Sequence, residues 1–245
     1  MQRQAQIRIL TVSLLVSAGC IAFAQNRPST LVVKVTAHME MSHPSASSNK
    51  HVQPLPPAVL WLKPLTPGIA IPTAALPKNS YTLLQKNKMF SPHLLVVPTG
   101  SVVHFPNADP FFHNVFSLFN GQRFDLGLYE AGKMKTVTFS REGVSYIFCN
   151  IHSDMSAVVL SLSTPFYSIA DAQGTFHIDA LPVGEYELHV WVEGEQQSTL
   201  DQWTRRESIS NENQDLGAIA VHTPAAVHHA NKFGQPYEPA GRPVY

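Results

Sequence analysis

The sequence predicts an all-β fold, because its apolar residues come in short runs separated by turn-forming residues. The 245-residue chain contains 19 prolines and 13 glycines, which divide it into short segments. The apolar runs are rich in Val, Leu and Phe, and long stretches with the 3.6-residue spacing of an amphipathic helix are missing. Strands joined by turns are therefore expected along most of the chain.

The chain is long enough for one large β domain or two small ones. Hydrophobic residues make up 44% of it and charged residues 14%, with a formal net charge of zero. Such a composition offers no broad basic surface for phosphate backbones or anionic lipids, so we expect no nucleic-acid partner. No segment beyond the N-terminus approaches the length needed to span a bilayer.

Residues 1–24 have the three parts of a secretory signal peptide. Arg3 and Arg8 precede an apolar stretch from Ile9 to Ala18, and Ala22-Phe23-Ala24 supplies a small-residue cleavage site. The apolar stretch is short for a membrane span. The mature protein is therefore expected to be exported to the periplasm.

The two cysteines have different fates in this scheme. Cys20 leaves with the signal peptide; attachment of a lipid to it is a less favoured alternative, since Ser17 stands where a bacterial lipobox has Leu. Cys149 is then a single thiol in a compartment that oxidises exposed thiols. It is either buried as a small apolar side chain or bound to a metal as a thiolate.

Alternation of apolar and polar residues predicts antiparallel strands with one buried face through much of the chain. The segment 223–245 has too little apolar pattern to fold by itself, and we expect a disordered tail there. The expected strands are 30–36, 58–65, 94–97, 101–105, 135–139, 144–148 and 157–162, followed by a further strand pair within 166–194.

Three candidate metal ligands follow the expected strand 144–148. Cys149, His152 and Met155 are spaced three residues apart, so one short loop can present a thiolate, an imidazole and a thioether inward. His113 follows a separate strand, and a β-sandwich can bring such distant segments together at one end. Two His, one Cys and a weak Met form the ligand set of blue-copper sites.

Copper suits these four donors better than the other metals that cysteine and histidine bind. Thiolate and thioether are soft ligands, and imidazole serves both oxidation states of copper. Zinc gains little from a thioether, and its structural sites usually contain more cysteines. An iron–sulfur cluster normally needs several cysteines. We therefore expect one copper ion, with zinc as an adventitious occupant.

The C-x2-H-x2-M loop, with His113-Asn114-Val115 upstream, resembles amicyanin and more broadly the plastocyanin-type cupredoxins, over about residues 81–163. The resemblance implies a Greek-key β-sandwich with a mononuclear type 1 copper ion. It implies that His113 and His152 are imidazole ligands, Cys149 the short thiolate ligand and Met155 the long axial ligand. It also implies that Asn114 ties the two ligand segments together.

By the same resemblance, His152 lies nearest the surface and passes electrons through an apolar patch. Ser153 and Asp154 depart from the family, whose loops carry Pro and an apolar residue there; a carboxylate beside the axial ligand would tune the potential or the choice of partner. Four phenylalanines could contribute to the patch, although ordinary core packing is at least as good an explanation for each. They are Phe111, Phe112, Phe116 and Phe119.

The segments 171–176 (DAQGTF) and 181–186 (LPVGEY) together resemble the carboxypeptidase regulatory-like domain, a small transthyretin-like β-sandwich. That module usually opens with two strands, which the strands at 30–36 and 58–65 would supply. We therefore predict a discontinuous second domain made of residues 28–65 and 164–222. The whole arrangement is similar to periplasmic proteins described as plastocyanin-like or methylamine-utilisation-like.

Other histidines are weaker candidates. The stretch 38–43 (HMEMSH) could bind copper loosely, but a solvated loop is the favoured interpretation. His93 and His104 lie on apolar strands, where a hydrogen-bonded interior histidine is more common than a further ligand.

The function expected from these patterns is electron transfer by a periplasmic type 1 copper protein with an unidentified redox partner. The chain contains no HExxH or GxSxG motif, so we expect no enzyme. One alternative is a copper-binding or chaperone protein that moves the metal. The other is a non-catalytic β-sandwich interaction module with a vestigial copper site.

Overall fold

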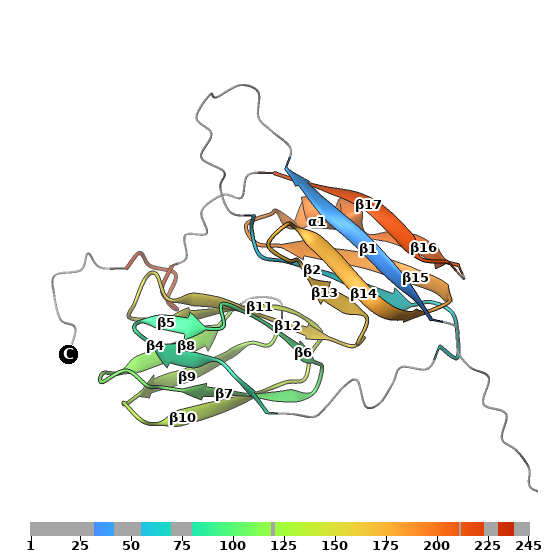
Figure 1. Ribbon diagram of the computed structural model, residues 1–245. Helices are drawn as coiled ribbons and strands as arrows, with labels where there is room; N and C mark the ends of the chain where they lie inside the picture. The colour runs from blue at the N-terminus through green and yellow to red at the C-terminus, as the bar shows by residue number, and fades with distance from the viewer. Residues whose placement is uncertain are drawn as a thin grey trace, which may run out of the picture. The chain divides into compact units, whose positions relative to one another are not determined.

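Figure 1 shows the computed structural model of the protein, which describes residues 32–41, 55–69, 80–118, 121–210, 212–222 and 230–237. Over these ranges the chain forms strands and one short helix, which confirms the predicted all-β fold class. In the part of the chain that is described, no helix has both the length and the hydropathy to cross a bilayer. The predicted signal peptide and Cys20 lie outside the described residues.

A β-sandwich occupies the middle of the chain. One of its sheets has the strand order β6-β12-β11-β8-β9, the other has the order β10-β7-β3, and β4 and β5 form a hairpin. Side chains from both sheets meet in one apolar core, which also contains Cys149 and Met155. The strands are β3 (Tyr81–Thr82), β4 (Leu84–Lys86), β5 (Met89–Ser91), β6 (Leu94–Pro98), β7 (Ser101–Pro106), β8 (His113–Ser117), β9 (Phe124–Tyr129), β10 (Met134–Phe139), β11 (Gly143–Cys149) and β12 (Ser156–Leu162).

The turn between β6 and β7 carries the chain from one sheet to the other. Strand β6 pairs in parallel with β12, whereas β7 pairs with β10. The N–H of Thr99 donates to the carbonyl of Leu162, and the N–H of Gly100 donates to that of Phe139. Gly100 has a φ of 92°, a left-handed conformation that glycine adopts without strain.

The strands that flank the middle sandwich in sequence pair with one another. Strand β1 (Val32–Met41) pairs with β14 and β17, and β2 (Ala58–Pro64) pairs with β13 and β15. The domain boundaries given above and the likeness to the carboxypeptidase regulatory-like domain remain predictions. The later elements are β13 (Tyr167–Ile169), β14 (Thr175–Pro182), β15 (Gly184–Val192), α1 (Gln197–Trp203), β16 (Arg205–Ile209) and β17 (Gln214–Val221).

Several elements differ from the sequence-based expectation: β8, β9, β16 and β17 were not predicted as strands, and the pair expected within 166–194 is the three strands β13, β14 and β15. Strand β1 extends to Met41, so His38 lies in a strand and not in a loop, with its Nε2 3.4 Å from a carboxylate oxygen of Glu40. Helix α1 has only seven residues and buries Leu200 alone, so it leaves no apolar periodicity in the sequence. His43 lies outside the described residues.

Strand β12 follows the loop 149–155, called the ligand loop because it carries Cys149, His152 and Met155. It is buried on both faces. Ala157 and Val159 belong to the core that contains Cys149. Val158 and Leu160 belong to a second core, which also contains Trp191 from β15. Because successive side chains of a strand point to opposite faces, β12 is held from both sides.

Val102 and Val103 test the assignment of the two faces of β7. Val103 is fully buried and Val102 is 37% exposed. We expect Val103→Ala to lower the free energy of unfolding by about 2 kcal/mol, because it removes buried methyl groups and leaves a cavity. Val102→Ala, which changes strand propensity equally, should cost less than about 0.5 kcal/mol. Urea unfolding followed by circular dichroism measures both, and equal losses would contradict this packing.

Candidate metal centre

Strand pairing brings two distant candidate ligands together. His113 is the first residue of β8 and Cys149 is the last residue of β11. The two strands are antiparallel neighbours, with Cys149 opposite Val115. His113 lies two residues from Val115 and therefore on the same face of β8, diagonal to Cys149.

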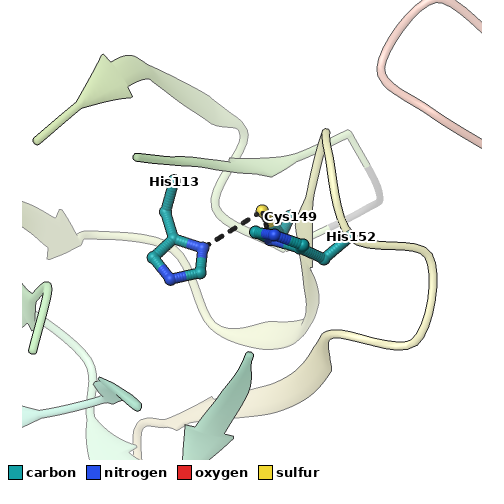
Figure 2. Close-up of side chains that lie close together, drawn as sticks. All are labelled: His113, Cys149 and His152. Carbon is teal, nitrogen blue, oxygen red and sulfur yellow. Dashed lines mark hydrogen bonds between the residues drawn. The ribbon is translucent and has the colours of Figure 1, made fainter. Parts of the chain in front are cut away.

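The side chains of His113, Cys149 and His152 converge, as Figure 2 shows. The Cys149 Sγ lies 3.6 Å from His113 Nδ1 and 3.4 Å from His152 Nδ1. The ligand atoms of the three residues all lie within 4.8 Å of one another. Ligand atoms at bond lengths of about 2.0–2.3 Å in a trigonal plane are about 3.7 Å apart, so the sulfur and the nitrogens are close to the spacing of a metal site. The described ranges contain no other such group of His, Cys, Asp or Glu.

The loop after β11 is closed by its own backbone. The Cys149 N–H donates to the Met155 carbonyl at 3.1 Å, and the Met155 N–H donates to the His152 carbonyl at 3.2 Å. Met155 is fully buried in the same apolar core as Cys149. These contacts place Met155 beside Cys149 and His152, while its role as an axial ligand stays a prediction.

A buried carboxylate, which the sequence analysis missed, holds His113. Asp109 Oδ2 lies 2.9 Å from His113 Nε2, and the Asp109 side chain is only 4% exposed. A neutral imidazole that donates from Nε2 keeps the lone pair of Nδ1 free for a metal. In the sequence, the only sign of this contact is that Asp109 lies four positions before His113. Its loop has no regular pattern that predicts where the carboxylate lies.

The hairpin between β4 and β5 in turn holds Asp109. The backbone N–H groups of Asn87 and Lys88 donate to its two carboxylate oxygens at 2.6 and 2.9 Å. Both residues have positive φ, 57° and 56°, which is uncommon outside glycine. The hairpin thus presents two donors to one carboxylate in the manner of an anion-binding nest.

Burial favours the neutral forms of His113, Cys149 and His152. It lowers the pKa of His113 against the opposing effect of Asp109, and it raises the pKa of the Cys149 thiol. Burial, with the nearby His113 and Lys88, lowers the pKa of His152 to about 4. The pKa of Asp109 is lowered overall, since hydrogen bonds from Lys88, His113 and Asn87 outweigh its own burial. Asp109 is therefore ionised beside a neutral His113.

Asn114 joins the two ligand segments through its backbone. Its carbonyl accepts a hydrogen bond from the Asn150 N–H at 2.9 Å, one residue beyond Cys149. Its side-chain amide donates instead to Asp125 Oδ1 at 2.8 Å.

The phenylalanines proposed for an apolar patch occupy different positions. The Phe111 ring lies 5.4 Å from the His113 ring and 5.5 Å from the His152 ring, measured between centroids. Phe112 is 50% exposed, whereas Phe116 is buried. Phe119 lies outside the described residues.

Neither of the other two histidines joins the cluster of ligands. His93 is hydrogen-bonded to Glu193 at 2.7 Å and to the Ser156 carbonyl at 3.2 Å, as expected, but it precedes β6 and its side chain is 43% exposed, so it is not an interior strand histidine. His104 is half-buried on β7, and its buried Nδ1 has no hydrogen-bond partner among the described residues, so the expectation of a hydrogen-bonded interior histidine is wrong at this position.

Part of the segment predicted to be disordered lies against the ligand loop. The Tyr237 hydroxyl donates to the Cys149 carbonyl at 2.7 Å, and the Lys232 N–H donates to Asn150 Oδ1 at 2.9 Å. At residues 230–237 the structure therefore differs from the expected disordered tail. Two hydrogen bonds to the loop hold this segment, and no local sequence pattern predicts them. Residues 223–229 and 238–245 lie outside the described ranges.

No family model and no curated protein matches the chain. Solved structures are similar over 34% of it: a copper-containing nitrite reductase from Thermus scotoductus SA-01 (22% identity, TM-score 0.33) and a purple cupredoxin from Nitrosopumilus maritimus (26%, 0.31). A reduced Cu(I) form of an amicyanin variant is 17% identical over the same share, with a TM-score of 0.32. The chain covers 22% of the nitrite reductase, 99% of the purple cupredoxin and 83% of the amicyanin.

The lowered pKa of His152 predicts that the metal-free protein loses stability in mild acid. The unfolded chain binds a proton near pH 6.5, whereas folded His152 does so only near pH 4. Protonation of His152 therefore favours the unfolded chain below pH 6.5. The free energy of unfolding falls by about 2 kcal/mol as the pH drops from 6.5 toward 4. Urea unfolding at pH 7 and 4.5 measures this loss. His152→Gln should reduce it, and an unchanged pH dependence in that variant would contradict the assignment.

Proposed function

We propose that residues 81–163 form a cupredoxin-type domain in which His113, Cys149, His152 and Met155 hold one type 1 copper ion. We propose further that the protein carries electrons between redox partners in the periplasm. The observation that carries this proposal is the buried Cys149 sulfur, 3.4 and 3.6 Å from two imidazole nitrogens.

The chemistry of the donors fits copper. One thiolate and two imidazoles, with a thioether beside them, match the soft and intermediate ligands that copper prefers in both oxidation states. Among the described residues, the converging group contains no carboxylate, and Asp109 is directed at the outer nitrogen of His113.

Bound copper would supply a one-electron Cu(II)/Cu(I) couple. The residues of the chain keep the ligands nearly fixed through that change. Asp109 orients His113, the backbone closes the loop between Cys149 and Met155, and the apolar core excludes water around the sulfur. His152 is the only partly exposed residue of the three converging ligands, so it offers the shortest path for an electron to the surface.

Burial favours electron transfer over delivery of copper to another protein. His113 and Cys149 are fully buried, and release of the metal would have to expose both. Ligands that open readily suit metal exchange, whereas a closed site suits repeated oxidation and reduction.

The rest of the chain is proposed to be non-catalytic. Residues 28–65 and 164–222 would form the carboxypeptidase regulatory-like β-sandwich, as an interaction module beside the copper domain. Residues 1–24 would direct export, after which the copper site would be loaded outside the cytoplasm.

Cys149→Ser tests the copper assignment. The copper-loaded wild type should show the intense visible absorption of a thiolate–Cu(II) bond and a reversible redox couple, and the variant should lose the colour because its ligand sulfur is gone. Ser153→Ala, in the same loop, should keep it. Rapid loss of copper to a chelator without a reversible couple would support the chaperone alternative. Absence of copper uptake would leave the interaction module.

Asp109→Asn tests the role of the buried carboxylate. Loss of the charge-assisted hydrogen bond to His113 should weaken copper binding by about 10- to 100-fold, measured by competition with a chelator. Asp154→Asn is the matched control, since Asp154 is an exposed carboxylate on the ligand loop whose side chain accepts from Ser153. Equal affinities for Asp109→Asn and the wild type would show that Asp109 does not support the site.

A further inference from the structure

The segment Ala230–Tyr237 forms a turn that closes on itself. The Asn231 side-chain oxygen accepts hydrogen bonds from the N–H groups of Phe233 and Gln235, at 2.9 and 3.0 Å. The Asn231 N–H donates to the Gln235 carbonyl, and the Gly234 N–H donates to the Asn231 carbonyl, both at 2.9 Å. The turn is therefore a defined local structure that can present side chains in fixed directions.

Lys232 completes a ring of hydrogen bonds around the ligand segments. Its N–H donates to Asn150 Oδ1 and its Nζ lies 2.8 Å from Asp125 Oδ2. The other oxygen of Asp125 accepts from the side chain of Asn114, whose carbonyl accepts from the Asn150 N–H. The ring thus joins β8, β9, the ligand loop and the C-terminal segment.

The contact between Lys232 and Asp125 is a partly exposed ion pair. The Lys232 side chain is 23% exposed and that of Asp125 is 41% exposed, and their contact pairs opposite charges. Burial of Asp125 opposes its ionisation, but the hydrogen bonds from Lys232, Asn114 and Gly127 prevail and lower its pKa.

Tyr237 contacts the backbone of Cys149, the proposed thiolate ligand. Its hydroxyl donates to the carbonyl of Cys149, 2.7 Å away, and this carbonyl belongs to the peptide that links Cys149 to the loop. The direction of this peptide sets where the loop leaves the strand. A donor fixed in the C-terminal turn therefore restricts the position of the loop relative to the sulfur.

We propose that Lys232 and Tyr237 are positioning residues that hold the loop 149–155 in its metal-binding geometry before copper arrives. The inference rests on the proposed copper function, because a restrained loop serves metal binding. The restraining hydrogen bonds themselves form in the chain without a metal. A loop held in advance loses less conformational entropy on binding and opens less often afterwards.

The first test uses the metal-free full-length protein. In Tyr237→Phe, the amide hydrogens of Cys149, Asn150 and Met155 should exchange about 10-fold faster by NMR, while amides in β12 keep the wild-type rate. Tyr167→Phe, the same change at a residue 37% exposed on β13, should leave all of them unchanged. Wild-type exchange in Tyr237→Phe, or equal acceleration in both variants, would overturn the inference.

The second test measures the rate at which copper is lost to a chelator. We expect loss to be about 10-fold faster in Tyr237→Phe and about threefold faster in Lys232→Met, with Lys232→Arg close to wild type. Lys133→Met, which breaks an exposed pair with Glu130 at 3.8 Å, is the control.

The two tests separate the two proposals. Wild-type protein that takes up no copper, with loop amides still accelerated in Tyr237→Phe, would overturn the copper function and leave the restraint. Wild-type protein with a stable copper couple, but with variants that release copper at the wild-type rate, would overturn the positioning role and leave the copper function.

Discussion

The Cys149 sulfur lies fully buried beside two imidazole nitrogens, and polar groups in an apolar core are costly unless each has a partner. Much of the surrounding structure follows from this cost. Asp109 binds the outer nitrogen of His113, and the backbone of Met155 and Asn114 binds the peptide groups on either side of Cys149. The two inner nitrogens and the sulfur are left facing one another, so a metal ion is the partner that best completes the pocket.

The supports of this pocket come from widely separated parts of the chain. Residues 87 and 88, in left-handed conformations, hold Asp109, while the turn 230–237 holds the other side of the ligand loop. Strand β12, which receives the loop, is buried on both faces. Restraints from several directions would keep the loop in place, which is what the proposed electron transfer requires of a ligand set.

The sequence predicted the structure most reliably where a pattern is local. Alternation and turn residues predicted the strands at 94–97, 101–105, 144–148 and 157–162, and the structure confirms each within a residue or two. The spacing of Cys149 and His152 predicted that one loop would bring them together. Such patterns repeat every two or three residues and can be read without knowledge of the fold. The seven-residue helix α1 is too short to show a helical pattern of apolar residues.

By itself, the sequence determined the β architecture and predicted four metal donors, of which the structure brings His113, Cys149 and His152 together; the preference of these donors for copper stays a proposal that depends on residue types. Only the tertiary structure decided which distant residues support them. Asp109 reaches His113 because the β4–β5 hairpin orients it, and Tyr237 reaches Cys149 across 88 positions of sequence. Contacts of this kind depend on how the strands pair and on where the chain passes the site again. No local sequence pattern predicts either.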